Sequence, residues 1–328
     1  MKVLVTGANS LLGSNLTRKL LQAGYKVKAM VRENSNLRSL EGVRPELFKG
    51  DFTNAAHVQQ ALNGCQIVIH AAANTSQWPS SYEHYKATNV DGVQRMLEES
   101  RLAGVDRFIL VGSANAFGPG SKTNPGNEST PFTPPQHRSG YMRSKFEAQQ
   151  LALNFHQKHG FPVTVVNPTF MLGKYDAKPS SGQLLMMAYG KKRMPCPSGG
   201  KNFVHVDDVA TGIVNAIERG QAGACYLLAH ENLSYEAFFK KMQAVSTYPK
   251  RLIKIPKPLL SLAGTAGSCY ENLTGKPAKL NSINAALLQA DNYYSPAKAV
   301  RELQLPQTPI EQAIHDALNW FNKQGYLS

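Results

Sequence analysis

Three tyrosine–lysine pairs in this chain have the spacing that proton transfer beside a carbonyl group requires. Hydride transfer to a carbonyl carbon leaves negative charge on the oxygen, so the site needs a proton donor and a polarising hydrogen bond. Tyrosine can be the donor if a nearby positive charge lowers its pKa from about 10, and a lysine four residues later lies on the same helix face. The pairs with this spacing are Tyr82/Lys86, Tyr141/Lys145 and Tyr294/Lys298.

The surrounding sequence favours Tyr141/Lys145. Only Tyr141 begins a predicted helix after both a strand, Arg107–Val111, and a long loop rich in Pro, Gly, Ser and Thr. Ser113 follows that strand, and parallel sheets bind ligands at the carboxyl ends of their strands, so Ser113 can face the same crevice. Ser113, Tyr141 and Lys145 are therefore the predicted catalytic residues, and the other two pairs are predicted to be structural.

The N-terminal segment predicts a site for a dinucleotide. A strand rich in β-branched residues, Lys2–Thr6, runs into a turn that carries Gly7, and Gly13 lies at the start of the apolar helix that follows over Leu11–Gln22. Such a turn brings backbone N–H groups close to a pyrophosphate, and the N-terminus of the helix adds partial positive charge.

The end of the second predicted strand indicates which dinucleotide is bound. An acidic residue there would bind a ribose 2′-OH and disfavour a 2′-phosphate. Arg32 stands at that position instead, with Arg38 a little further on, and the planar donor fork of arginine suits a 2′-phosphate. Glu33 argues the other way, since its carboxylate can bond a ribose. We expect NADP(H) to be preferred, with NAD(H) as the alternative.

The elements that must position these residues alternate between strands and helices in the first half of the chain. This alternation predicts an α/β fold of the Rossmann type, a doubly wound parallel sheet with helices on both faces. Strands are predicted at Lys2–Thr6, Lys26–Val31, Glu46–Lys49, Ile67–Ala71, Arg107–Val111 and Val163–Asn167, and helices near Leu11–Gln22, Ala55–Leu62, Tyr82–Ala103 and Tyr141–His159.

After Pro168 the pattern changes. The segment Met171–Lys201 has the character of an insertion, strands at Phe203–Val206 and Cys225–Leu228 flank a helix at Asp207–Arg219, and a mostly helical tail follows from Ser234. We expect residues 1–170 plus 203–230 to form the dinucleotide-binding domain. Residues 171–202 plus 231–328 would form a smaller, mostly helical C-terminal lobe that binds the substrate.

Composition and charge exclude several classes of protein. With 42% hydrophobic and 18% charged residues the chain has a globular composition, and its four cysteines are scattered, as expected of reduced thiols in the cytoplasm. No secretion signal is expected before the first strand. The net charge of +14 comes with no nucleic-acid-binding motif, so a solvated basic surface that steers anionic ligands is predicted, and no nucleic-acid partner.

Two further patterns have an alternative interpretation. The apolar stretch Leu259–Ala266 could touch a membrane but is too short to span one, so a buried helix and no stable membrane insertion are predicted. His70, His205 and Asp207 do not form a compact set of metal ligands, so no metal is expected. Asp207 is predicted to cap the N-terminus of the helix that ends at Arg219.

The motifs together resemble those of an extended short-chain dehydrogenase/reductase of the NAD-dependent epimerase/dehydratase superfamily. Within it the sequence is most similar to dihydroflavonol-reductase-like proteins and the hopanoid-associated sugar epimerase group. The matching segments are Thr6–Gly13, Gly50–Asp51, His70–Ala73, Asn89–Gly92, Gly112–Gly118, Tyr141–Lys145, Asn167–Thr169, Phe203–Ala210, Tyr294–Ala299 and Trp320–Phe321.

The resemblance implies a role for each matching residue. Tyr141 would donate or accept the proton, Lys145 would lower its pKa and bind the nicotinamide ribose, and Ser113 would polarise the substrate oxygen. Ser10 replaces the usual middle glycine, so its side chain either hinders close approach or bonds a phosphate oxygen. The cofactor would further contact Gly7, Ser10, Leu11, Leu12 and Gly13 (pyrophosphate), Asp51 and Phe52 (adenine), Ala71, Ala72 and Ala73 (adenosine-side ribose), Pro168, Thr169 and Phe170 (nicotinamide), with Asn89 supporting the site.

Three functions are compatible with this reading. The first is an NADP(H)-dependent reductase or dehydrogenase acting on a ketone or aldehyde of medium size. The second is a nucleotide-sugar epimerase or dehydratase that holds its nicotinamide tightly, and the third is a dinucleotide-binding protein without catalysis. The apolar residues after Pro168 favour the first. The resemblance also implies a homodimer, formed through the helices Tyr82–Ala103 and Tyr141–His159.

Overall fold

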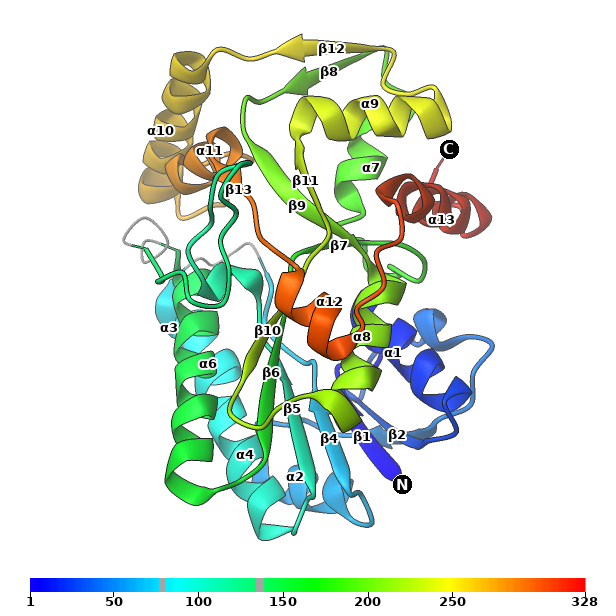
Figure 1. Cartoon of the computed structure of the whole chain (residues 1–328). Coiled ribbons are helices and arrows are strands. Elements are labelled where there is room, and N and C mark those ends of the chain that lie inside the picture. The colour runs from blue at the N-terminus through cyan, green and yellow to red at the C-terminus, as the bar shows by residue number, and fades with distance from the viewer. Residues whose placement is uncertain (77–80, 134–138, 328) are drawn as a thin grey trace.

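A parallel sheet of seven strands forms the centre of the Rossmann-type part of the computed structural model, which describes residues 1–76, 81–133 and 139–327 (Figure 1). The strand order is β10-β6-β5-β4-β1-β2-β3, and neighbouring strands run parallel. This confirms the predicted α/β fold of the Rossmann type. The strands are β1 (Lys2–Thr6), β2 (Lys26–Val31), β3 (Glu46–Lys49), β4 (Ile67–His70), β5 (Arg107–Val111), β6 (Val163–Pro168) and β10 (Cys225–Leu228).

Helices bury both faces of this sheet. Successive side chains of a strand point to opposite faces, so Val3 and Val5 of β1 pack into one core and Leu4 packs into the other. The first face is covered by α1 (Leu11–Gln22), α8 (Val206–Arg219) and α12 (Ala297–Leu303), and the second by α2 (Ala55–Leu62), α4 (Gly92–Leu102) and α6 (Gly140–His159). Burial on both sides explains why inner strands such as β5 and β6 are mostly apolar, whereas the edge strand β3 is largely exposed.

Smaller sheets and helices lie above the strand ends (Figure 1). β7 (Phe170–Leu172), β9 (Gly200–His205), β11 (Glu231–Ser234) and β13 (Asp291–Asn292) form one sheet, and β8 (Arg193–Cys196) pairs with β12 (Arg251–Lys254). A third apolar core joins α7 (Gln183–Ala188), α9 (Tyr235–Ser246) and α13 (Ile310–Lys323). The predicted domain division stays a prediction. The second half of β9 falls in the predicted dinucleotide-binding domain but pairs within this upper sheet, whereas α12 falls in the predicted lobe but packs against the large sheet.

Two predicted helices differ in their detail. The segment Tyr82–Ala103 consists of α3 (Tyr82–Lys86), a π-helical turn (Ala87–Asp91) and α4. Such a turn leaves the helical apolar pattern nearly intact, so the sequence does not reveal it.

The prediction that Asp207 is the N-cap of α8 is wrong. The helix begins at Val206, and the Nδ1 atom of His205, the N-cap residue, accepts the backbone N–H of Asp207 at 3.0 Å.

The stretch Leu259–Ala266, predicted to be a buried helix, lies in α10 (Lys257–Thr274) and is largely exposed. Leu259 and Leu262 are 59% and 69% exposed, and of α10 only Leu260 and Gly264 are buried. The reason is that α10 packs through one face only, against α11 (Ser282–Gln289).

Candidate active site

The carboxyl ends of the central strands meet at one edge of the large sheet. Thr6 at the end of β1 pairs with His70 at the end of β4, and His70 pairs with Leu110 of β5. The strand order reverses between β1 and β4, since β2 and β3 lie on one side of β1 and β4 to β6 on the other. Open α/β sheets bind ligands outside the strand ends at such a switch point, so this edge is the candidate active site.

The three predicted catalytic residues come together at this edge. Tyr141 lies in the first turn of α6 and Lys145 one turn later, so both side chains lie on one face of the helix. The buried ammonium of Lys145 donates a hydrogen bond to the carbonyl oxygen of Val111, the last residue of β5, at 2.9 Å. Ser113 follows β5, and its side chain hydrogen-bonds with that of Tyr141.

Burial controls the proton affinities of the pair. It lowers the pKa of Lys145 from 10.5 to about 8. It raises the pKa of Tyr141, while the hydrogen bond with Ser113 opposes the rise. The expected lowering of the tyrosine pKa is therefore not found here, because desolvation outweighs the hydrogen bond with Ser113. At neutral pH Tyr141 carries its proton and most of the Lys145 ammonium groups are charged.

Asn167, a residue of β6 to which sequence reasoning gave no role of its own, fixes the backbone at Ser113. Its Oδ1 atom accepts the N–H of Ser113 at 2.9 Å. A Cβ at Gly112 would lie 2.1 Å from that oxygen, which explains why glycine precedes the serine. The Nδ2 atom of Asn167 is buried without a hydrogen-bond partner among the described residues. No local pattern marks this contact, because 54 residues separate its partners.

Asn89 supports the site from the π-helical turn. Its Nδ2 atom donates to the carbonyl of Asn74 and to the hydroxyl of Ser144 on α6, each at 3.0 Å, and its Oδ1 atom accepts the N–H of Asn74 at 2.7 Å. Ser144 is the residue before Lys145. Asn89 therefore links the segment after β4 to the helix that carries Tyr141 and Lys145.

The glycine turn after β1 allows very close backbone contacts. Gly7 has φ +66°, and a Cβ there would lie 2.9 Å from the Cα of Ala72. A Cβ at Gly13 would lie 2.1 Å from the carbonyl oxygen of Gly7. The hydroxyl of Ser10 accepts the N–H of Gly13 at 3.0 Å and so caps α1. The amides of Leu11 and Leu12 lie in the first helical turn, where N–H groups have no intrahelical acceptor.

The two arginines predicted to recognise a 2′-phosphate lie in different surroundings. Arg32, just after β2, is exposed, and its side chain has no hydrogen bond or ion pair within the described part of the chain. Arg38 instead donates to the carbonyl of Gln324 at 3.1 Å, so it is held by the C-terminal segment. The carboxylate of Glu33 pairs with Lys49 at 3.1 Å, which partly neutralises it.

The remaining predicted cofactor residues lie at the ends of β4 and β6 or just after β3. The carboxylate of Asp51 caps the turn that follows it, and the ring of Phe52 meets that of His70 at 4.9 Å, edge to face. The N–H of Ala72 donates to the hydroxyl of Thr6 at 3.1 Å. Partly exposed residues at these strand ends are Ala71, Ala72, Ala73, Thr169 and Phe170, whereas Pro168 is buried.

This geometry agrees with what sequence comparison finds. Residues 3–229 match the NAD dependent epimerase/dehydratase family. The chain belongs to this family. It is 31% identical over 98% of its length, and 95% of the relative's, to a "putative dihydroflavonol 4-reductase" of Synechocystis sp.. It is 29% identical to "sterol demethylase protein B" of Methylococcus capsulatus over the full length of both chains.

Solved structures of related proteins have the same fold. The crystal structure of gox2253 has a TM-score of 0.85 and 28% identity, covering 99% of each chain. A Thermus thermophilus UDP-glucose 4-epimerase in complex with NAD has a TM-score of 0.78 and 17% identity, covering 98% of this chain and 99% of its own. As a member of this family, the protein is an NAD(P)-dependent enzyme of the extended short-chain dehydrogenase/reductase type.

The two other tyrosine–lysine pairs are engaged elsewhere. The hydroxyl of Tyr82 bonds the carboxylate of Glu147, and Lys86 pairs with Asp91. The Tyr294 hydroxyl donates to the carbonyl of Phe117, and Lys298 donates to the carbonyl of Cys225. In the described parts of the chain, no group of three or more His, Cys, Asp or Glu side chains could hold a metal ion.

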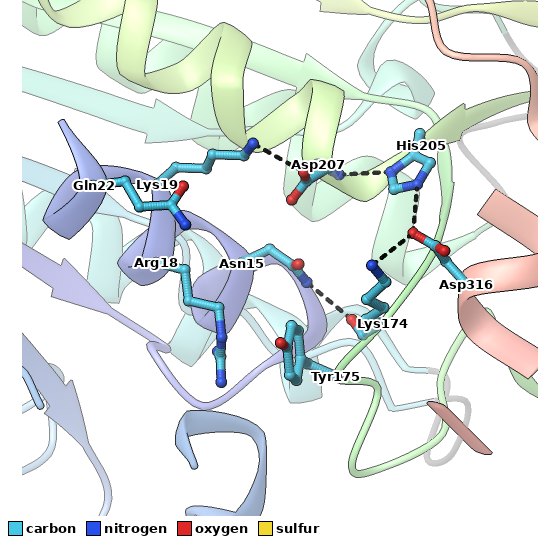
Figure 2. Close-up of a pocket in the computed structure, with 9 residues that line it drawn as sticks. All are labelled: Asn15, Arg18, Lys19, Gln22, Lys174, Tyr175, His205, Asp207 and Asp316. Atoms are coloured by element: carbon cyan, nitrogen blue, oxygen red, sulfur yellow. Dashed lines mark hydrogen bonds and ion pairs between the residues drawn. The ribbon is translucent and has the colours of Figure 1, made fainter. Parts of the chain in front are cut away.

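A separate cavity of 170 Å³ lies between α1, α8 and α13 (Figure 2). Asp316 of α13 accepts from Lys174 at 3.0 Å and lies 3.4 Å from the Nε2 atom of His205. Lys19 of α1 pairs with Asp207 at 2.9 Å. None of the predicted site residues lines this cavity, and its charged side chains are mostly paired with each other. The cavity therefore marks where the C-terminal helix is fastened to the Rossmann part.

Proposed function

We propose that this chain reduces a ketone or aldehyde of medium size with NADP(H), and that Tyr141 gives a proton to the carbonyl oxygen. The observation that carries the proposal is the joint position of Ser113, Tyr141 and Lys145 at the switch-point edge, with the ammonium buried beneath the tyrosine helix. A hydroxyl donor, a polarising hydroxyl and a buried positive charge are what developing charge on a carbonyl oxygen requires.

The residues at this edge fit a nicotinamide dinucleotide. The positions of Gly7 and Gly13 have no room for a Cβ, and the amides of Leu11 and Leu12 in the first turn of α1 provide donors for a pyrophosphate. When bound, the cofactor supplies the hydride. The residues proposed to hold it are Gly7, Ser10, Leu11, Leu12, Gly13, Arg32, Asp51, Phe52, Ala71, Ala72, Ala73, Asn89, Tyr141, Lys145, Pro168, Thr169 and Phe170.

Ser113, Tyr141 and Lys145 would each have a different role at the carbonyl oxygen of the substrate. Ser113 orients and polarises the oxygen, and the neutral phenol of Tyr141 donates its proton to it. The positive charge of Lys145 stabilises the phenolate that remains. A Tyr141→Phe variant should lose about 10²- to 10⁴-fold in kcat, whereas Tyr82→Phe, a tyrosine with the same lysine spacing on the outer helix, should keep its kcat. Equal kcat values for Tyr141→Phe and wild type would refute the proton-donor role.

NADP(H) is the proposed cofactor because Arg32 is exposed and unpaired within the described residues while Glu33 is occupied by Lys49. Arg32→Ala should weaken NADP⁺ binding roughly tenfold to a hundredfold, the range of a charge-assisted hydrogen bond, and leave NAD⁺ binding nearly unchanged. Arg38→Ala should have a smaller effect, because the C-terminal segment already holds that guanidinium. A dissociation constant for NAD⁺ below that for NADP⁺ in the wild type would overturn the preference.

An apolar carbonyl compound is the proposed substrate class. The residues that follow the nicotinamide end of β6 are Phe170 and Met171, and the relatives named above are a sterol demethylase protein and a dihydroflavonol reductase. Stoichiometric oxidation of added NADPH by such a carbonyl compound is the direct test. NADPH consumption with none of a panel of aromatic and terpenoid ketones and aldehydes would argue against this substrate class.

A nucleotide-sugar epimerase or dehydratase is the second candidate, favoured by the shared fold with a sugar-nucleotide epimerase. Such an enzyme regenerates its cofactor in each cycle and so retains it. Native mass spectrometry of the purified protein distinguishes the two, because a retained nicotinamide favours the epimerase cycle and an empty protein favours the reductase. The same spectrum tests the expected homodimer.

A further inference from the structure

The helix α10 presents an apolar stripe to solvent. Exposed residues with mainly apolar side chains make up this stripe: Leu259, Leu262, Ala263, Ala266, Cys269, Tyr270 and Leu273. At about 100° per residue they occupy roughly 120° of the helix circumference, and the helix is about 27 Å long. Leu262 and Leu273 are 69% and 86% exposed, so most of each side chain is in water. An apolar face of this width normally packs against a core.

The opposite face of α10 is the one that holds the helix in the fold. A Cβ at Gly264 would lie 2.5 Å from the Cβ of Ala285 in α11, and one at Gly267 would lie 1.8 Å from the carbonyl of Leu280. The carboxylate of Glu271 accepts the N–H of Ala278 at 3.1 Å on this side. The apolar stripe is therefore not required for the packing of α10 on α11.

Positive charge flanks the apolar stripe at both ends. Lys257 begins the helix, and Lys276 and Lys279 follow its last turn, all three exposed. Between residues 250 and 280 the sequence has six basic residues and one acidic residue, Glu271, which is turned toward α11. A second copy of the chain seated on the stripe would bring two such basic ends together, whereas an anionic lipid surface would complement them.

We propose that α10 docks this protein onto the surface of an anionic bilayer. The stripe would lie among the lipid acyl chains just below the headgroups, Tyr270 at the interface, and Lys257, Lys276 and Lys279 beside the lipid phosphates. No helix within the described residues is long and apolar enough to cross a membrane, so α10 lies on the bilayer rather than through it.

Docking through α10 would bring the loop that follows Ser113, beside the candidate active site, near the membrane. The chain that leaves α11 forms bridges from Tyr293 to Gly120 and from Tyr294 to Gly126, both in the loop that follows Ser113 (Figure 1). These bridges connect the segment that carries α10 and α11 to the candidate active-site edge. A lipophilic substrate dissolved in the bilayer would then be taken up from the membrane rather than from water.

Vesicle flotation of the full chain, without cofactor or substrate, tests the proposal. Wild type should float with vesicles of phosphatidylglycerol and phosphatidylcholine mixed equally, should bind pure phosphatidylcholine less, and should be released by high salt. Leu273→Glu removes an exposed leucine that would enter the acyl-chain region and adds a negative charge, so its partition coefficient should fall at least tenfold. Asn272→Glu adds the same charge beside the stripe and should lower binding only about fivefold.

Thermal unfolding confirms that each variant is folded, as expected for changes at exposed positions. Absence of wild-type flotation, or equal losses in Leu273→Glu and Asn272→Glu, would overturn the proposal. Concentration-dependent self-association that Leu273→Glu abolishes, without vesicle binding, would overturn it and assign the stripe to a second copy. The assay contains no reacting groups, so its failure leaves the proposed reaction untouched.

Discussion

The buried ammonium of Lys145 should make the native protein less stable than a variant without it. Burial lowers the pKa of this group from 10.5 to about 8, and the difference corresponds to about 3 kcal/mol against the charged native form at neutral pH. Lys145→Met keeps a similar apolar length and removes the charge. It also leaves the Val111 carbonyl without its donor, at a cost of about 1–2 kcal/mol. We expect Lys145→Met to be more stable at pH 7 by about 1–2 kcal/mol, with almost no activity.

The pH dependence identifies the cause. Between about pH 8 and 10.5 the unfolded chain holds the Lys145 proton and the native protein loses it, so native stability rises with pH in this window. The variant lacks this contribution. The free energy of unfolding is measured by urea denaturation with circular dichroism. The value for wild type minus the value for Lys145→Met should therefore rise by about 2 kcal/mol between pH 7.5 and 9.5.

A stability gap between wild type and Lys145→Met that does not change over this range would refute the assignment of a destabilised buried ammonium. Lys323→Met, which removes an exposed lysine near the C-terminus, is the matched control for loss of a positive charge. Its gap to wild type should stay constant with pH.

Four other outcomes are expected. Gly13→Ala would place a Cβ 2.1 Å from the carbonyl of Gly7, so titration should show NADPH affinity lost. Asn89→Ala, which removes the link to α6, should lower the free energy of unfolding by about 1–3 kcal/mol in urea titrations and reduce kcat. The kcat for reduction should fall as pH rises through about 8, because Lys145 then loses its charge. Asp316→Ala removes the carboxylate that contacts Lys174 and His205, and the melting temperature should drop.

The central sheet and the position of Tyr141 and Lys145 at its strand-end edge could be predicted because local rules determine them. The helix Leu11–Gln22 has both predicted ends, since Ser10 supplies an N-cap oxygen and Gly24 follows its last turn. Tyr141 could be chosen over two other tyrosines because the carboxyl ends of parallel strands share an edge, a rule that needs only the order of elements. In the structure, the hydrogen bond of Lys145 to the end of β5 also sets this pair apart from the other two.

Contacts between distant segments could not be predicted. Arg38 donates a hydrogen bond to the carbonyl of Gln324, 286 residues away. Asn167 of β6 accepts the N–H of Ser113, which follows the neighbouring strand β5. The donor and acceptor groups of these side chains follow from the sequence, but the partner of each group is determined by tertiary packing. The N-cap at His205 was missed for a different reason, because aspartate is the more frequent cap and the helix starts one residue earlier.

The exposure of α10 shows what hydrophobicity alone leaves undecided. The sequence of Leu259–Ala266 is apolar enough for burial, but a helix has two sides, and only the position of α11 determines which one is covered. Small residues at Gly264 and Gly267 allow α11 to approach closely, so the packed face needs little apolar surface. The large side chains of Leu259, Leu262 and Leu273 are left on the other side, where folding does not use them. Apolar groups kept in water between basic ends are explained by a partner outside the chain, and an anionic bilayer provides both the apolar phase and the opposite charge.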